Sequence, residues 1–418
     1  MHAIIASIGT DGDILPFLGL GVALRARGHR VTVVAAGNYH DLVVANGVEF
    51  RSLVSAEKMR ELLANPDFWH PIKTAVFTAR WSRDLMEPEF RLLDSIASEP
   101  GSVLITNPAV FGAAMAHEKR GVPLCHVILQ PWMIHSAIAP ALMPIASMPR
   151  WAPRFVHSLF YHVMDVVAGV LVGPSLNRLR RSIGLKPMRR ILHNWLSHEL
   201  VIGMFPPWFG PPQKDWPAQI RLAGFPRFDG AVDRKPPVGL PDFLNSHKPT
   251  VAFTFGSGMM HASRLFELAA RVCESIDCQG VFINRHFVPE RLPARMFDAR
   301  FIPFRDIFPR CAAVVHHGGV GTTAEALAVG TPQLIVPFGF DQLDNGDRVR
   351  RLGMGLHTRS KHRLIGRGGR VRDGDVAELA NALRQLLSKE FRERCRRFTK
   401  PQENALETAA SWVEEMAR

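Results

Sequence analysis

Short apolar runs alternate along the chain with longer segments that have the periodicity of helices. At the start, the apolar run Ile4–Ile8 is followed by a polar loop and by a helical segment from Leu15 to about Arg27. Val31–Ala35 then repeats the apolar run. Buried parallel strands read as continuous apolar runs between helices, so this pattern predicts a strand–helix–strand unit. We therefore expect an α/β fold that begins as a Rossmann-like sheet.

The same pattern starts again after a proline-rich stretch without periodicity, residues 227–249. A chain of 418 residues is long enough for two domains. Such a stretch is typical of a linker, and the strand expected at Thr250–Phe255 opens the second half. We predict a first domain at 1–226, a second domain at 250–400, and a final helix within 401–418 that packs back on the first domain.

The most informative stretch runs from His316 to Asn345. A glycine-rich loop separates the apolar run Ala312–Val315 from a helix expected at about Thr322–Val329. The loop glycines are Gly318, Gly319 and Gly321. Bare backbone amides and a helix N-terminus meet at one point there, which favours a phosphate group.

Polar side chains stand where a nucleotide ligand would need them. His317 can donate to a phosphate oxygen, and Glu325 can accept hydrogen bonds from a ribose diol. Asp341 and Gln342 follow the next expected strand, at the edge where open parallel sheets bind ligands. A glycine-rich loop alone often binds nothing, but the full combination at these offsets is far more specific.

This combination resembles the donor-binding motif of family-one glycosyltransferases, which include plant UDP-glycosyltransferases and bacterial antibiotic, sterol and rhamnolipid enzymes. The resemblance extends over most of the chain and implies the GT-B architecture, two Rossmann-like domains facing across a cleft. Met1–Arg30 and Pro206–Gly230 look like the rhamnosyltransferases that complete rhamnolipids, whereas His317 and Glu325 look more like the glucosyltransferase pattern. The sugar therefore stays open between glucose and rhamnose, and its carrier between UDP and dTDP.

The resemblance also implies roles for residues of the second domain. Ser257, with His317 and the loop amides, would hold the diphosphate, although a serine there is also an ordinary turn residue. Phe301 would stack on the nucleobase, or would be a plain core aromatic, and Asp341 and Gln342 would hold sugar hydroxyls. The donor-binding set is Ser257, Phe301, Ile302, His317, Gly319, Gly321, Thr322, Glu325, Asp341 and Gln342.

The catalytic base implied by the resemblance is Asp13, which follows the first strand where plant members carry a histidine. A carboxylate can take the proton of an acceptor hydroxyl, best when burial raises its pKa. The alternative is that Asp13 only caps the following helix. Asn107 stands where plant members carry a supporting aspartate, and Asn107, Gly12 and Trp132 are candidate support or acceptor residues.

No cofactor or metal is expected, since the resemblance implies an inverting, metal-independent reaction. The 5 cysteines are scattered without a CxxC spacing, and the 18 histidines contain no HExxH pattern. Two D-x-D strings, Asp11–Asp13 and Asp373–Asp375, could in principle hold a metal on a diphosphate. We interpret the first as the loop of the base and the second as a turn before a helix.

The net charge of +13 fits anionic donor phosphates, and no basic motif interleaved with aromatic residues indicates nucleic acid. The apolar helix expected at Phe155–Leu176, with the arginines after it, could dock on an anionic membrane surface, although the charge could equally be solubilising. The N-terminus enters a strand without a basic leader, which favours a cytoplasmic protein, at the inner face of the membrane if that helix docks.

Three functions compete. The first is transfer of a hexose to a hydroxyl of an apolar acceptor such as a lipid, sterol, polyketide or phenol. The second is a sugar-nucleotide epimerase of the same fold, which the long apolar region Ile138–His198 disfavours because an epimerase needs no acceptor pocket. The third is a non-catalytic nucleotide-sugar-binding partner subunit, which Asp13 disfavours.

Overall fold

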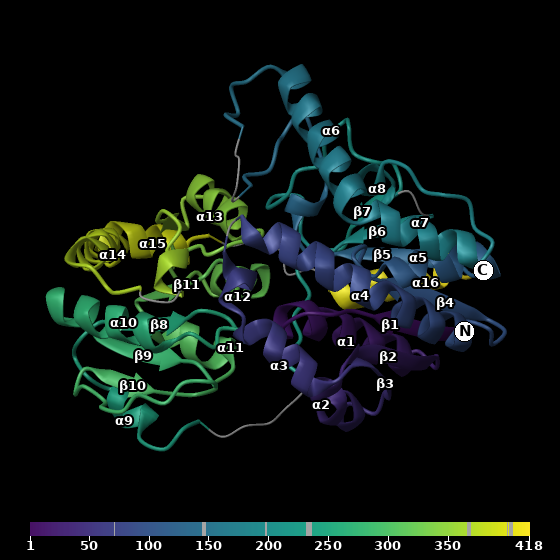
Figure 1. The fold of residues 1–418 in the computed structure, drawn as a ribbon. Helices are drawn as coiled ribbons and strands as arrows, with labels where there is room; N and C mark the ends of the chain where they lie inside the picture. Colours follow the sequence, from purple (N-terminus) through teal and green to yellow (C-terminus); the bar gives the residue numbers. More distant parts are fainter. Residues whose placement is uncertain are drawn as a thin grey trace.

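The computed structural model describes residues 1–70, 72–143, 148–196, 199–230, 236–365, 369–398, 400 and 404–418. The chain forms two α/β units that lie side by side, the first on the right of Figure 1 and the second on the left. Each unit contains one sheet, and every strand pairing in both sheets is parallel. The two-domain α/β prediction is therefore confirmed.

The first sheet has seven strands in the order β3-β2-β1-β4-β5-β6-β7. They are β1 (His2–Ala6), β2 (Arg30–Ala36), β3 (Glu49–Val54), β4 (Ser102–Thr106), β5 (Leu124–Ile128), β6 (Leu200–Gly203) and β7 (Ile220–Leu222). The α-helices of this unit are α1 (Asp11–Ala26), α2 (His40–Ala45), α3 (Ala56–Ala64), α4 (Lys73–Ile96), α5 (Phe111–Arg120), α6 (Arg154–Leu171), α7 (Gly173–Ser182) and α8 (Ile191–Asn194). Short 3-10 turns cover Gly37–Tyr39, Pro66–Trp69 and Pro131–Met133.

The second sheet has six strands in the order β10-β9-β8-β11-β12-β13. They are β8 (Thr250–Thr254), β9 (Gln279–Ile283), β10 (Met296–Asp298), β11 (Ala313–His316), β12 (Gln333–Ile335) and β13 (Gly355–His357). The helices that follow β7 in the chain are α9 (Leu240–Leu244), α10 (Ser263–Ser275), α11 (Phe304–Ile307), α12 (Val320–Ala328), α13 (Gln342–Arg351), α14 (Asp373–Leu386), α15 (Lys389–Arg396) and α16 (Ala405–Met416). Further 3-10 turns cover Phe308–Arg310 and His362–Leu364.

The central strands are buried along their whole length, as their unbroken apolar sequences require. Chain order along the first sheet reverses between β1 and β4, and along the second between β8 and β11. Ligands of open α/β sheets bind at such switch points, beyond the carboxyl ends of the strands. The loops after β1, β4, β8 and β11 are therefore the places to look for a site.

The last helix of the chain returns to the first domain. One face of α16 packs into the core beneath α1, and this face contributes Ala405, Ala409, Ala410 and Val413. Arg27 at the end of α1 lies 2.7 Å from the Glu414 carboxylate. Figure 1 shows the carboxyl end near the amino end as a result.

Two local predictions were wrong, and a third lies partly outside the described residues. Helix α1 begins at Asp11 rather than near Leu15, because Thr10 and Asp13 form a capping box that starts the helix earlier, and Pro16 lies within it. The single helix expected at Phe155–Leu176 is two helices, α6 and α7, whose axes differ by 59°. Part of the expected linker, residues 231–235, lies outside the described residues, and another part forms the short helix α9.

Candidate functional site

The two domains touch through the loops at their switch points. The backbone amide of Asp11, at the start of α1, donates to the Ser257 hydroxyl after β8 at 3.0 Å. Asp11 makes a second contact across the domains through its side chain. Its carboxylate lies 2.6 Å from the guanidinium of Arg285, which follows β9. Tyr39 holds the second oxygen of that carboxylate at 3.0 Å. The loop that carries Asp13 is thus fixed directly against the loop that carries Ser257.

Asp13 caps α1 and still offers one oxygen. Its Oδ2 accepts hydrogen bonds from the Thr10 amide at 2.8 Å and the Thr10 hydroxyl at 3.2 Å. Within the described part of the chain, Oδ1 has no hydrogen-bond partner. Burial raises the pKa of this carboxyl, the nearby Asp11 charge raises it further, and the bonds from Thr10 oppose the rise. The cap and the base are therefore compatible roles, because they use different oxygens.

Gly9 allows Asp13 to take this position. Its φ is +149°, and a side chain there would collide with the Asp13 carboxylate. The glycine therefore lets the loop after β1 fold closely over the acid.

The glycine loop after β11 presents an open helix N-terminus. Gly319 is the N-cap of α12, no side chain caps this helix, and its first turn contains no acidic residue. Gly318 has a φ of +94°, and a Cβ there would lie 2.7 Å from Ile335. Space around Gly321 is open for at least 4 Å. Amides at such a terminus, with no side-chain acceptor, suit an anion.

Two histidines shape this loop in different ways. His316 is buried, where its Nδ1 accepts from the Gly318 amide at 3.2 Å and its Nε2 donates to the Gln333 carbonyl oxygen at 3.0 Å. Burial lowers its pKa to about 3. His317 lies against the backbone of both glycine loops, 3.1 Å from the position of a Cβ on Gly256. Burial lowers the pKa of His317 to about 4, so at neutral pH it is an uncharged donor.

Glu325 lies in α12 with its side chain 21% exposed, and the Arg227 guanidinium from the interdomain connection is 3.4 Å away. This ion pair brings a cation to the carboxylate predicted to bind ribose. Thr322 is buried in the first turns of the same helix.

Phe301 and Ile302 follow β10 in the chain. Ile302 is buried, whereas the Phe301 ring is partly exposed and has the Arg285 guanidinium 5.4 Å from its centroid. The exposed part of the Phe301 ring, where a nucleobase was predicted to stack, is therefore shared with the Arg285 guanidinium. The sequence analysis did not single out Arg285, although a charged residue directly after β9, at the ligand edge of the sheet, was a usable signal.

Asp341 and Asn345 join α13 to the glycine loop. Asn345 Nδ2 donates to Asp341 Oδ2 at 2.6 Å and to the Gly318 carbonyl at 2.9 Å. Burial raises the pKa of Asp341 to about 7, and the charge of Asp13 adds to this rise across the domain contact. The side-chain oxygen of Gln342 accepts from the backbone amides of Phe338 and Gly339, so its amide nitrogen is the group that the prediction of sugar binding requires.

In the described part of the chain, none of the candidate support residues is a hydrogen-bond partner of Asp13. Asn107 accepts from the Ala109 amide at 2.8 Å and closes its own turn. Gly12 is exposed in the first turn of α1. Trp132 is partly buried in an aromatic cluster, and among the described residues its indole nitrogen has no hydrogen-bond partner. Support of Asp13 comes instead from Thr10.

The two D-x-D strings are engaged with protein groups. Asp11 pairs with Arg285 and Asp13 with Thr10, as given above. Asp373 binds Arg271 at 2.5 Å, and Asp375 binds Lys361 at 3.2 Å. Over the described ranges, no group of three or more His, Cys, Asp or Glu side chains could hold a metal ion.

Comparisons with known proteins agree with this geometry. Residues 3–139 match the "Glycosyltransferase family 28 N-terminal domain" model, and residues 283–394 match the "Erythromycin biosynthesis protein CIII-like, C-terminal domain" model. A sterol 3-beta-glucosyltransferase of Arabidopsis thaliana is 26% identical over 84% of this chain and 59% of its own length. One from Eremothecium gossypii is 27% identical over 84% of this chain and 30% of its own length. This chain therefore spans less than two thirds of the length of these relatives.

Solved structures match the whole chain. The calicheamicin glycosyltransferase CalG4 has a TM-score of 0.68 and 20% identity, and covers 99% of this chain and 97% of its own. The glycosyltransferase VinC in complex with dTDP has a TM-score of 0.67 and 19% identity, and covers 100% of this chain and 99% of its own. The GT-B fold predicted from the sequence is confirmed, and the resemblance to family-one glycosyltransferases is supported from both halves of the chain.

Proposed function

We propose that this chain, a homologue of GT-B glycosyltransferases, transfers a hexose from a UDP- or dTDP-sugar to a hydroxyl of an apolar acceptor, with inversion and without a metal or other cofactor. One observation carries the proposal. The loop after β1, which carries Asp13, contacts the second domain at Ser257, and the uncapped N-terminus of α12 belongs to that same domain. Acceptor activation and donor binding are thereby brought to one place.

In this proposal, the second domain binds the sugar donor. The open amides of α12 and the uncharged His317 stabilise the diphosphate, and the Ser257 hydroxyl donates to it from the opposite side. Glu325 accepts from the ribose, Phe301 stacks on the base, and Asp341 with the Gln342 amide holds sugar hydroxyls. The helix terminus is the main source of positive potential for the departing diphosphate, which is the role that a metal has in other transferases.

The first domain supplies the base. As the acceptor oxygen forms its bond to the anomeric carbon, its proton passes to Asp13 Oδ1, while Oδ2 stays anchored on Thr10. The bond from carbon to the diphosphate oxygen breaks, and its electron pair leaves with the diphosphate. The base belongs to the first domain, and the groups that bind the leaving diphosphate belong to the second. The acceptor therefore attacks the face of the sugar opposite the diphosphate, and this attack inverts the anomeric centre. A pKa raised by burial makes Asp13 a stronger base than a solvated aspartate.

The acceptor class follows from the relatives and from the chain itself. The matched relatives are named sterol 3-beta-glucosyltransferases, and matched structures include glycosyltransferases of calicheamicin and spinosyn. The first domain contributes aromatic side chains, among them the indole of Trp132, to a hydrophobic cluster that also contains Leu327 of α12. An apolar molecule with a free hydroxyl fits both, and glucose is the first sugar to test.

The test is a donor and acceptor screen. Purified protein is incubated with UDP-glucose, dTDP-glucose and dTDP-rhamnose, each with a sterol, a polyketide aglycone, a phenol and a hydroxylated lipid. Mass spectrometry detects glycosides, and a coupled assay follows nucleotide release. The proposal predicts release that depends on an added alcohol. Conversion of the donor sugar without any alcohol would instead indicate an epimerase, and donor binding with no turnover throughout would indicate a binding subunit.

A further inference from the structure

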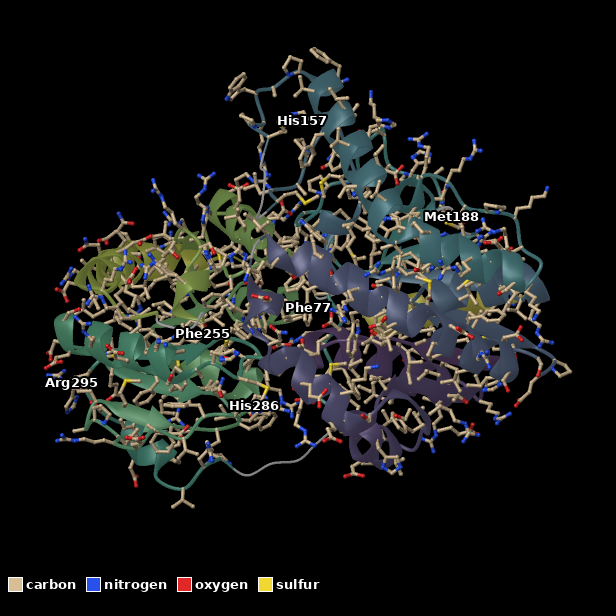
Figure 2. The ribbon with its side chains drawn as sticks, viewed as in Figure 1. Phe77, His157, Met188, Phe255, His286 and Arg295 are labelled. Carbon is tan, nitrogen blue, oxygen red and sulfur yellow. The ribbon has the colours of Figure 1, made fainter. Side chains whose placement is uncertain are left out.

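Helix α6 exposes an apolar face. Along it, large hydrophobic side chains recur every three or four residues and are 44–72% exposed: Phe155, Leu159, Val163, Val166, Val167 and Val170. Trp151, just before the helix, is 85% exposed. The opposite face is buried through Tyr161 and Asp165, and through His157, labelled in Figure 2. Figure 1 shows α6 projecting beyond both sheets, so this face, with Trp151, forms an outer apolar edge of the molecule.

The surroundings of this face are positively charged. Between residues 131 and 198 the sequence contains a single acidic residue, Asp165. That carboxylate is buried, accepts from the Leu192 amide at 2.7 Å, and lies 3.6 Å from Arg190. The exposed cations near α6 and α7 are Arg154, Arg178, Arg181, Lys186, Arg189 and Arg190. An apolar stripe that is flanked by cations, with no exposed acid in its own segment, is complementary to an anionic surface.

The segment that precedes α6 contacts α13. In the segment before it, the Leu142 amide donates to Asp344 at 3.0 Å, and Arg150 lies 2.8 Å from Asp347. Both acids belong to α13, the helix that begins directly after Asp341. The segment that leads into α6 is therefore held against the helix that begins after Asp341.

We propose that the exposed face of α6, together with Trp151, docks on an anionic lipid bilayer, with the helix lying along the surface and the flanking arginines on the lipid headgroups. A second copy of this chain would bring two cationic surfaces together, whereas anionic lipid neutralises them. Among the described residues, no single helix could span a membrane, and α6 with α7 meets that test only as a bent pair. The inference rests on the surface alone and holds whichever reaction the site performs.

Cosedimentation with vesicles tests the proposal. Wild-type protein is compared with Leu159→Asp/Val163→Asp, which places two acids on the apolar face. The matched control is Val44→Asp/Val238→Asp, with the same change of charge at positions 50% and 100% exposed elsewhere. On phosphatidylcholine vesicles containing phosphatidylglycerol, at low salt, we expect wild type and control to sediment equally. The α6 variant should bind at least tenfold more weakly, and phosphatidylcholine alone should bind little.

Two further measurements sharpen the test. Binding to vesicles should shift the tryptophan emission of wild type to shorter wavelength, because Trp151 enters an apolar environment. The Trp151→Phe variant should lose most of this shift. Turnover of a water-soluble acceptor, where it exists, should be equal in all variants, so a failure of the transferase proposal is seen separately from a failure of docking. Equal sedimentation of wild type and the α6 variant would overturn the inference. So would an absence of wild-type binding, or a dimer in sedimentation velocity that the α6 variant abolishes.

Discussion

The helix N-termini of α1 and α12 are built from similar parts and end in opposite electrostatic states. Both follow a central parallel strand and a glycine-containing loop. The first turn of α1 contains Asp11 and Asp13, and Asp13 accepts from the N-cap amide. The first turn of α12 contains no acid, and no side chain caps it. At the N-terminus of α1, a carboxylate of the same helix accepts from the N-cap amide. At the N-terminus of α12, the backbone amides remain available to an external anion.

This difference explains how two domains of the same fold can have different roles in glycosyl transfer. A carboxylate at the N-terminus of α1 repels a diphosphate and remains available as a proton acceptor. A terminus without acids attracts the diphosphate and stabilises the charge that develops as it leaves. The variants below test this division of roles, and they are given in order from the largest expected effect to the smallest.

Removal of the basic oxygen from α1 should have the largest effect. Asp13→Asn keeps the size and much of the cap, but takes away the proton acceptor, so kcat should fall by about 10²–10⁴. Donor affinity should barely change, because the donor belongs to the other domain. Steady-state kinetics with an unactivated alcohol measure both, and Asp373→Asn, which removes an acid at a distant helix start, is the control. An acidic phenol is unsuitable as acceptor because it is already partly ionised.

Asp341, which lies at the start of α13 next to the glycine loop, is tested through protein stability. Its pKa in the folded protein is about 7, against an ordinary 3.8, so its contribution to stability is complete below about pH 4 and is lost as the pH rises through 7. Asp341→Asn removes this loss. The variant should be more stable than wild type at pH 8 by up to about 4 kcal/mol, with the difference shrinking towards pH 4. Urea unfolding at the two pH values measures it, and a constant difference would contradict the assigned pKa.

Glu325 tests the donor side directly. A partly buried carboxylate that accepts two ribose hydrogen bonds is worth roughly 1–3 kcal/mol for each, so Glu325→Ala should weaken UDP binding about tenfold or more. Calorimetry measures the affinity. Arg227→Ala, which removes the cation paired with Glu325 and keeps the carboxylate, serves as the companion variant. Unchanged UDP affinity in Glu325→Ala would remove this residue from the donor site.

The cap made by Asp13 should have the smallest effect. Asp13→Ala removes the acceptor of the Thr10 amide and should lower the free energy of unfolding by roughly 0.5–2 kcal/mol. Chemical denaturation measures it. Asp13→Asn should lose less, because its side-chain oxygen can still accept from Thr10. Equal losses in the two variants would show that the cap depends on charge rather than on the hydrogen bond.

Much of this fold could be predicted from the sequence, because buried parallel strands and amphipathic helices leave local patterns. Both sheets and the glycine loop after β11 were recognised in this way. The start of α1 was also readable, since Thr10 and Asp13 have the spacing of a capping box, but the glycines around them suggested a longer loop. The mostly apolar character of residues 155–176 likewise concealed the bend between α6 and α7, where Gly173 and Pro174 stand.

The contacts that assemble the site could not be predicted in this way. The pairing of Arg285 with Asp11 joins residues far apart in sequence, and so does the bond from Asn345 to Gly318. No local pattern encodes such contacts, because they arise only when two domains or two elements dock. The exposure of the α6 face is of the same kind: the local pattern predicts an apolar helix, and only the packing of its neighbours leaves Phe155 and Leu159 uncovered.

The most direct test of the central claim is to give α12 the acid that α1 has. Gly321 lies in the first turn of α12 in open space, so Gly321→Asp fits, and Gly321→Asn is its uncharged counterpart of equal size. An acid at this position stabilises the helix, so the fold should survive. Calorimetric titration with UDP and dTDP should show at least a tenfold weaker affinity for Gly321→Asp than for Gly321→Asn. Equal affinities would contradict the claim that the open terminus of α12 holds the diphosphate.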